Sequence, residues 1–402
     1  MEWKKNLYLI AFGQLLGTLG FQFCIPFLPY FVMELGVDDA QVTLWSSALT
    51  AAPSVLLIVF SPIWGNLADK YGRKMMVSRA MVAGFIVVFL MSRVVTVEQL
   101  FILRLMQGAF TGIIAANIAL VSSIVPSEKL GSSLGLMQMT FYSGTSFGPI
   151  VGGLLADIFG YRTSFLIAAF LLLIASLTII VFVKENFKPP EEKVETTGAE
   201  KKSFVESKAL LVSPVLFTMS YLLFASQFSI NAMFPIIPLF VRDLTSNVAQ
   251  LSTLSGTIIS ITGFTAALST VYMGRLGDAK GYHRVLLIST AATSILFGLH
   301  FFTVDIYQLA LARAMVGFAM GGILPTANAI IGRSVRDEKR GQAYGISASA
   351  SYLGNFLGPL LAGIFATYIG MRSVFLLVAG LFLIGLLLIK KSAEGEKNGK
   401  AV

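Results

Sequence analysis

Long apolar stretches separated by short polar connections dominate the chain. A membrane-spanning helix needs roughly 20 predominantly apolar residues to cross a hydrocarbon core about 30 Å thick. Twelve such windows can be placed, at about residues 7–32, 42–63, 75–95, 98–123, 131–155, 161–183, 213–240, 250–274, 284–302, 305–331, 341–367 and 372–390. An even number of crossings returns the chain to the side on which it began, so both termini are expected on one side of the membrane.

The longest polar run divides these windows into two groups of six. Residues 184–212 are rich in Glu and Lys and show no apolar periodicity. We therefore predict an all-α polytopic membrane protein of two pseudo-symmetric six-helix bundles, 1–183 and 213–391, with a cytoplasmic linker between them and a cytoplasmic tail at 392–402. The linker composition is typical of a solvated tether, and a regulatory docking segment is the alternative.

Positive charge indicates which side is cytoplasmic, because Lys and Arg near helix ends stay on that side. With both termini inside, 23 of the 30 Lys and Arg residues lie in inside segments and four lie outside, at Arg93, Arg162, Arg242 and Arg372. The first window is longer than a signal-peptide core and has no small-residue cleavage pattern before Glu34, so it is expected to be retained. We expect a multi-pass protein of the plasma membrane with both termini cytoplasmic.

Composition excludes several function classes. Because 55% of the residues are hydrophobic and 13% are charged, the lipid bilayer is the expected partner, and the one-sided bias explains the net charge of +9 without a nucleic-acid surface. One cysteine, Cys24, and two distant histidines, His283 and His300, give no disulfide or zinc signature. The sequence also has no phosphate-cradling Walker loop. We expect no catalytic residue, no metal and no cofactor, and hence no enzyme.

The second half of the chain repeats the first at an offset of 209 or 210 residues. The matched segments are Pro26–Pro29 with Pro235–Pro238, Gly65–Asp69 with Gly274–Asp278, Arg104–Gly108 with Arg313–Gly317, Gly144–Gly153 with Gly354–Gly363, and Arg162 with Arg372. Each copy holds an even number of spans, so the copies are related by an axis along the membrane normal. Such halves commonly enclose a site at their interface and rock about it, which favours transport over catalysis.

A Pro-x-x-Pro pair is expected to interrupt the first span of each half. Proline removes a backbone donor and breaks or kinks a helix. Helices interrupted in corresponding positions point to a binding site. Kinks that only set the packing are the alternative interpretation.

The connection between the second and third spans carries the most specific motif. It reads Gly65-Asn66-Leu67-Ala68-Asp69-Lys70-Tyr71-Gly72-Arg73-Lys74 and resembles the signature loop of the major facilitator superfamily. Gly65 and Gly72 are expected to permit tight backbone turns. The resemblance implies that Asp69 lies against the N-terminus of the eleventh helix, where the helix dipole favours an anion by about 0.3–1 kcal/mol. Asp69 would then latch one conformation, with Asp278 as its degraded counterpart; a turn with solvated charges is the alternative.

Two further segments resemble superfamily motifs. Arg104 and Gly108 resemble the motif of the fourth span, where an arginine is costly unless it faces a polar interior or snorkels outward. Gly148 and Pro149 lie in a run that resembles the motif of antiporter-type exporters, although close helix packing alone explains the same residues. Over essentially the whole chain, the resemblance is closest to twelve-helix drug:proton antiporters of the bacterial multidrug-efflux subgroup.

Polar and adaptable side chains deep in the spans are candidates for a substrate cavity. They are Gln14, Gln22, Met106, Phe110, Asn117, Gln138, Tyr142, Tyr221, Gln227, Asn231 and Asn328. Any single one is more typical of helix packing than of ligand contact. As a set they suit varied lipophilic molecules.

All 21 acidic residues lie in connections or near span ends. Antiporters that favour cationic drugs usually keep a deep acid, so the substrates are expected to be mainly neutral, zwitterionic or anionic, with Arg104 as a partner. Proton coupling is implied by the resemblance alone. If it operates, Glu34 and Asp305 are the candidate proton carriers, together with Asp69.

These features predict a secondary-active exporter of lipophilic small molecules that works by alternating access, as a monomer and driven by the proton gradient. A dedicated exporter of one metabolite, such as a siderophore, sugar or lipid intermediate, is the second interpretation. A non-transporting receptor or a membrane enzyme fits the composition, but the sequence has no clustered acid, His or Cys constellation within a span.

Overall fold

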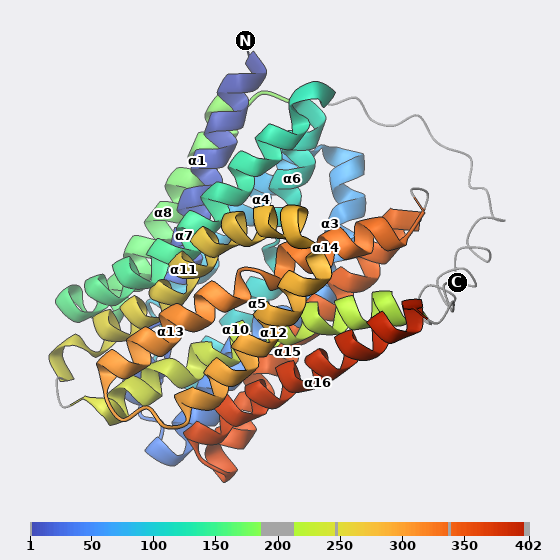
Figure 1. The fold of residues 1–402 in the computed structure, drawn as a ribbon. Coiled ribbons are helices and arrows are strands. Elements are labelled where there is room, and N and C mark those ends of the chain that lie inside the picture. The colour runs from blue at the N-terminus through green and yellow to red at the C-terminus, as the bar shows by residue number, and fades with distance from the viewer. Residues whose placement is uncertain (1, 186–212, 246–247, 337–338, 398–402) are drawn as a thin grey trace. The chain divides into compact units, whose positions relative to one another are not determined.

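The computed structural model describes residues 2–185, 213–245, 248–336 and 339–397, which form helices joined by short connections (Figure 1). Residues 186–212 of the expected linker and 398–402 of the expected tail lie outside this described part. The all-α fold class predicted from the apolar windows is confirmed for the described residues.

The helices of the first half of the chain are α1 (Glu2–Gln22), α2 (Leu28–Glu34), α3 (Asp39–Tyr71), α4 (Arg73–Met91), α5 (Val97–Phe110), α6 (Ile113–Ile124), α7 (Leu130–Phe159) and α8 (Tyr161–Phe182). Those of the second half are α10 (Pro214–Leu244), α11 (Leu251–Lys280), α12 (Tyr282–His300), α13 (Ile306–Met320), α14 (Ile323–Ser334), α15 (Arg340–Tyr368) and α16 (Met371–Lys397). Within the described residues, nine helical segments are long and apolar enough to cross a membrane. The predicted spans outside these nine correspond to α1 with α2, to α5 with α6, and to the Gly- and Ser-rich α7.

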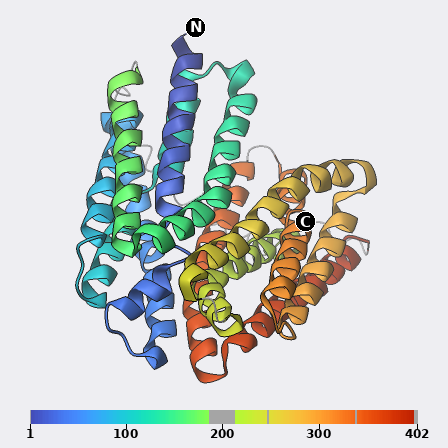
Figure 2. The same cartoon turned by 90° about the vertical axis from the view of Figure 1, so that its left-hand side faces the viewer.

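The chain forms two compact units, and the first of them includes a segment from the second half of the chain. Unit 1 comprises Met1–Lys193 together with Ile237–Ser260, and unit 2 comprises Val194–Ile236 together with Ile261–Val402. The boundary therefore falls inside α10 and inside α11, so the end of α10 and the start of α11 pack with the first six-helix bundle. Inside unit 1, α1 lies between α7 and α8 (Figure 2).

The first predicted span is interrupted, whereas its counterpart in the second half is continuous. Helix α1 ends at Gln22 and α2 begins at Leu28, as the first Pro-x-x-Pro pair predicts. The fully buried ring of Phe27 stacks on Tyr161 at 5.5 Å between ring centres, and this packing fixes the connection against α8. Pro235 and Pro238 instead lie inside α10, so the expected second interruption is wrong. A proline costs one helical hydrogen bond, and the packing of the buried α10 outweighs that loss.

The fourth span of each half is broken, which the apolar pattern did not predict. Helix α5 gives way to α6 at Thr111 and Gly112, and Gly112 has a φ of +139°, which a side chain would strain. The Trp64 indole Nε1 donates to the Ala109 carbonyl at 2.6 Å, satisfying an acceptor that an unbroken helix would have paired internally. In the second half, α13 and α14 are separated at Gly321 and Gly322, the corresponding place.

The internal repeat is confirmed by matching contacts. A Cβ on Gly108 would collide with the carbonyl of Pro53, and a Cβ on Gly317 would collide with the carbonyl of Thr262. These two carbonyls are themselves 209 residues apart. In each half, the glycine of the fourth span therefore lets it approach the backbone of the second span.

The paired arginines make the second matching contact. Arg162 donates to the carbonyls of Ser92 and Val94 at 3.2 and 2.7 Å. Arg372 donates to the carbonyls of Phe301 and Thr303 at 2.5 and 2.9 Å. Each arginine thus ties the start of the sixth span to the end of the third, where backbone acceptors have no partner within their own helix.

Candidate functional site

Arg104 is buried inside unit 1. Helix α5 holds it at 6% exposure, and its Nη1 donates to Gln107 Oε1 at 3.0 Å. Its Nη2 donates to the Sγ of Cys24 at 3.0 Å, in the connection between α1 and α2. The guanidinium therefore faces the bundle interior and does not snorkel outward. It joins α5 to the interruption of the first span.

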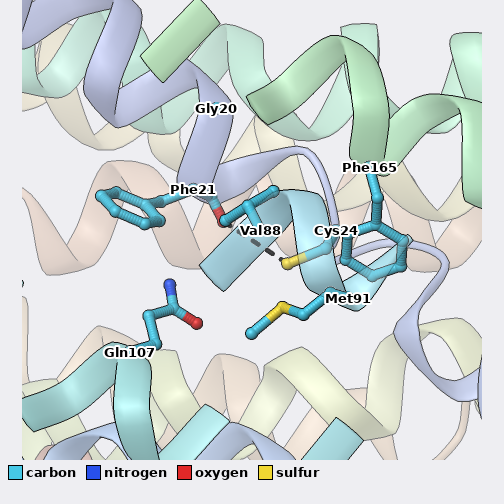
Figure 3. A pocket seen from close by; sticks show the side chains of 7 residues that line it. All are labelled: Gly20, Phe21, Cys24, Val88, Met91, Gln107 and Phe165. Atoms are coloured by element: carbon cyan, nitrogen blue, oxygen red, sulfur yellow. Dashed lines mark hydrogen bonds between the residues drawn. The ribbon is translucent and has the colours of Figure 1, made fainter. Parts of the chain in front are cut away.

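A small cavity lies beside this cluster. Its lining is mostly apolar and includes Cys24 and Gln107 together with Gly20, Phe21, Val88, Met91 and Phe165 (Figure 3). Its volume of about 10 Å³ is close to the minimum that holds one water molecule. A drug-sized molecule does not fit in this cavity.

Two of the expected cavity residues form a buried network in unit 1. Gln14 Nε2 donates to the Met137 carbonyl at 2.7 Å, and Asn117 Nδ2 donates to Gln14 Oε1 at 3.1 Å. Both side chains are buried. In this structure they join α1, α6 and α7.

The expected cavity residues of unit 2 make a second set of contacts. Asn231 Nδ2 donates to Asn355 Oδ1 at 2.9 Å, joining α10 to α15. The Tyr221 hydroxyl donates to the Leu381 carbonyl of α16 at 2.9 Å. Asn328 is half-buried, and its carbonyl accepts from the Tyr344 hydroxyl at 3.1 Å. These residues join helices at positions that keep part of each side chain accessible.

The remaining cavity candidates differ in exposure. Met106 and Phe110 on α5 are exposed by 37% and 36%, and Gln138 on α7 is also exposed. Gln22, Tyr142 and Gln227 are half-buried. Among the apolar candidates, Met106 and Phe110 thus keep part of their surface exposed, and their place in a substrate cavity stays a prediction.

The signature loop is shorter than predicted. Gly65 lies within α3, so the expected turn at this residue is wrong, and the chain turns at Gly72, whose φ is +98°. The side chain of Asp69 lies outside the described part of the structure. The backbone N–H groups of Arg73 and Lys74 donate to the Glu185 carboxylate at 3.1 and 2.9 Å, which caps the start of α4. The loop is thus tied to the residues that follow α8.

The other acids named from the sequence lie at helix ends. Asp278 is exposed in the last turns of α11 and accepts from the Tyr282 hydroxyl. Glu34 is exposed and pairs with Arg162 at 3.6 Å. Asp305 caps α13, accepting from the N–H groups of Tyr307 and Gln308.

The glycine and proline motif of α7 packs against two helices. A Cβ on Gly148 would lie 2.6 Å from the Cβ of Gln22 on α1. A Cβ on Gly256 of α11 would collide with the carbonyl of Pro149. Small residues on both sides bring α7 close to α1 and to the start of α11.

Asp157, near the end of α7, is a functional candidate that sequence reasoning missed. Its carboxylate accepts from the Ser252 and Thr253 N–H groups at 3.2 and 2.7 Å and from the Thr253 hydroxyl at 2.6 Å. These groups form the first turn of α11, so Asp157 caps that helix from another element. We call this arrangement the α7–α11 latch. The only sequence signal was an acid near the end of a span, which many residues share.

Tyr30 was also missed. Its buried hydroxyl donates to the carbonyl of Pro238 on α10 at 2.5 Å and lies 2.9 Å from Ser255 Oγ on α11. Nearby, Arg242 Nη1 donates to Asp39 Oδ1 at 3.1 Å. Together with the α7–α11 latch, these contacts hold the end of α10 and the start of α11 within unit 1.

Comparison with known proteins agrees with the resemblance. The family model described as Major Facilitator Superfamily matches residues 10–256 and 224–401. The multi-drug resistance efflux pump PmrA of Streptococcus pneumoniae serotype 4 is 35% identical over 375 residues, 93% of this chain and 92% of that protein. The multidrug resistance protein MdtG of Salmonella arizonae is 33% identical over 384 residues, 95% of this chain and 94% of that protein.

A solved structure supports the fold. The inward-facing, unoccupied structure of a bacterial homologue of the human lysosomal transporter Spinster has a TM-score of 0.77 at 14% identity, covering 98% of this chain and 97% of that one. At that identity the likeness concerns the fold alone. Family model, relatives and fold agree, and the chain belongs to the major facilitator superfamily, as a multi-pass membrane transporter and not an enzyme.

Proposed function

We propose that this protein is a secondary-active exporter of varied lipophilic small molecules that works by alternating access and is driven by the proton gradient. The relatives named as multidrug efflux pumps cover more than nine-tenths of the chain, which supports this substrate class. The structural observation that carries the proposal is the α7–α11 latch, because its hydrogen bonds inside unit 1 can break and re-form.

The latch is suited to a reversible closure. A carboxylate at a helix N-terminus gains from the orphan N–H groups and from the helix dipole, each worth on the order of 1 kcal/mol. The Asp157 side chain makes both kinds of interaction with α11: it accepts from two backbone N–H groups and places a negative charge at the helix N-terminus. Helix α11 begins in unit 1 and continues into unit 2 beyond Ser260. Breaking the bonds to Asp157 therefore releases the end of this helix that belongs to unit 1.

Tyr30 supports the same closure from α2. Its hydroxyl reaches a backbone carbonyl of α10 and the Ser255 hydroxyl of α11, so one side chain holds both helices that run into unit 2. Because the charge bias predicts that both termini are cytoplasmic, we expect this end of the bundle to face outward. We therefore infer that Tyr30 and the α7–α11 latch close the outer end of the transport path.

Proton coupling rests on the acids at helix ends. We propose that the proton carrier is one of Glu34, Asp305 and Asp69. A test is transport into proteoliposomes with an imposed pH gradient: we expect uptake to rise with the gradient and to fall when the responsible acid is replaced by its amide. Transport that ignores the gradient would exclude this mechanism.

The function is tested with a panel of dyes and antibiotics in efflux-deficient cells. We expect the wild-type protein to lower the accumulation of several unrelated lipophilic compounds, and Asp69→Asn to weaken all of these effects together. An effect on one compound only would indicate a dedicated metabolite exporter. No change in any accumulation, with the protein present in the membrane, would overturn the proposal.

Sidedness and assembly need their own measurements. We expect epitope tags at both termini to be digested by protease in inverted vesicles and protected in intact cells. We also expect the purified protein in detergent to have the mass of one chain. Opposite accessibility of the tags would reverse the assignment of the outer end.

A further inference from the structure

Arg79 is a cation inside unit 1 that neither the repeat nor the superfamily motifs explain. It lies on α4, half-buried, with its guanidinium carbon 3.3 Å from the centre of the Trp64 ring on α3. Its Nε and Nη1 atoms are both buried and have no hydrogen-bond partner. Buried polar groups are nearly always paired in folded proteins, so two unpaired donors on one charged group need an explanation.

The surroundings of Arg79 are aromatic. Phe60 stacks with Trp64 at 6.3 Å between ring centres, and Phe110 of α5 lies 6.5 Å from Trp64. Phe110 keeps more than a third of its surface exposed, so this edge of the cluster is accessible, while the Nε and Nη1 atoms of Arg79 lie beneath it. We call Phe60, Trp64, Arg79 and Phe110 the Arg79 cluster.

The stacking leaves the Nε and Nη1 donors of Arg79 without a partner, and both atoms are buried in this structure. An arginine that lies flat on a ring uses its face for the cation–π contact and keeps its N–H groups pointing outward in the plane. Those groups match carboxylate and sulfonate oxygens, to which arginine donates strong, charge-assisted hydrogen bonds. The neighbouring rings offer an apolar wall to the rest of such a molecule.

We propose that the Arg79 cluster is a binding subsite for the anionic group of aromatic carboxylates or sulfonates. This inference rests on the proposed function, since it names a substrate class for the same transporter. It moves the expected anion partner from Arg104 to Arg79. Arg104 has two nitrogens bonded to Gln107 and Cys24 and one unpaired nitrogen, Nε, whereas Arg79 has two unpaired nitrogens and an exposed aromatic residue, Phe110, in its cluster.

The cluster is also connected to a break in the helices. The Trp64 ring lies under Arg79, and its Nε1 donates to the Ala109 carbonyl near the end of α5. A ligand that pulls on Arg79 or displaces Trp64 therefore acts on the α5–α6 break. Binding at the cluster can in this way bias the arrangement of the fourth span.

Binding is tested with purified protein and carboxyfluorescein, by fluorescence anisotropy. We expect saturable binding that weakens about tenfold or more in Arg79→Gln, because a charge-assisted bond is lost, and weakens less in Arg79→Lys. Trp64→Phe should also weaken binding. The matched control is Arg93→Gln, which removes another arginine that lies over a ring, 5.9 Å from Phe89 and outside the cluster. Equal binding by wild type and Arg79→Gln would overturn the subsite.

Dye efflux from cells distinguishes a failure of the subsite from a failure of the proposed export function. In cells, we expect Arg79→Gln to reduce carboxyfluorescein efflux while efflux of an uncharged lipophilic dye, Nile red, continues, which also shows that the variant folds. Parallel loss of both dyes in Arg79→Gln and Arg79→Lys, with normal carboxyfluorescein binding, would mean that Arg79 serves packing alone and would refute the subsite. If wild type moves no dye but still binds carboxyfluorescein through Arg79, the proposed function fails and the subsite stands.

Discussion

Replacing Asp157 with asparagine should open the end of the bundle that the α7–α11 latch closes. The substitution keeps the size of the side chain and removes its charge. The carboxylate accepts three hydrogen bonds, two of them from the first N–H groups of α11. An amide oxygen can still accept, but it loses the charge assistance and the favourable term with the helix dipole.

The loss can be converted into a population shift. Hydrogen bonds to charged groups contribute more than neutral ones, and the dipole adds about 0.3–1 kcal/mol, so we expect the latched state to lose about 1–3 kcal/mol. A shift of that size changes the ratio of unlatched to latched protein by roughly 5- to 150-fold. Thr253→Val, which removes only the hydroxyl bond, should give a smaller shift in the same direction.

The assay uses a single reporter cysteine. Ser252 is fully buried in the described structure, and its backbone N–H, not its side chain, bonds to Asp157. In a Cys24→Ala background, Ser252→Cys should react slowly with a membrane-impermeant maleimide added to intact cells. Asp157→Asn should raise that rate by the factor given above.

Asp243→Asn is the matched control. It also removes one negative charge near the same end, but Asp243 is exposed and its ion pair is with the adjacent Arg242 at 4.0 Å. A labelling rate in Asp157→Asn equal to that of this control would refute the latch. Labelling confined to inverted vesicles would refute the assignment of this end to the outside.

Three further predictions concern packing and capping. Gly108→Ala should lower the thermal unfolding temperature by an amount equivalent to about 1–3 kcal/mol, because the added Cβ meets the Pro53 carbonyl. The control Gly65→Ala should be neutral or slightly stabilising, because no atom lies within 4 Å of its added Cβ. Equal effects of the two substitutions would contradict the packing of Gly108. Arg162→Gln should destabilise unit 1 by about 1–3 kcal/mol in the same measurement, since two carbonyls lose a charged donor; no change would mean that water replaces the arginine. Tyr30→Phe removes a buried hydroxyl bond and should speed labelling of the reporter cysteine by several-fold, about 1 kcal/mol, while an unchanged rate would remove Tyr30 from the closure.

The apolar pattern and the internal repeat predicted the fold class and several contacts. Twenty-residue apolar windows reflect a local requirement, the crossing of a bilayer, so they can be found in the sequence. The repeat then identified Arg162 with Arg372 and Gly108 with Gly317, and each pair makes equivalent contacts.

Helix interruptions were predicted less well because tertiary packing decides them. Prolines alone indicated a break in α10, but the helix continues through Pro235 and Pro238. The break after Phe110 carries no proline and depends on Trp64, which lies 45 residues earlier in the chain. A sequence pattern of local residues cannot reveal such a partner.

The candidate site shows the same limit. Asp157 was visible as an acid near a span end, but its function as a cap for α11 depends on a helix that starts almost a hundred residues later. The roles of Arg79 and Arg104 are likewise set by their neighbours, since Arg104 donates to Gln107 and Cys24 whereas Arg79 lies over the Trp64 ring. Residue type and depth do not distinguish them.

The recurring contacts also explain how the two halves could diverge after duplication. Gly108 and Gly317 each lie against a backbone carbonyl, and Arg162 and Arg372 each donate to backbone carbonyls. Every residue has a backbone carbonyl, so the residue that the glycine packs against can differ between the halves: it is Pro53 in one half and Thr262 in the other. Mutations could therefore accumulate on one side of each contact without cost to the other, and the halves could acquire different pockets on a shared framework.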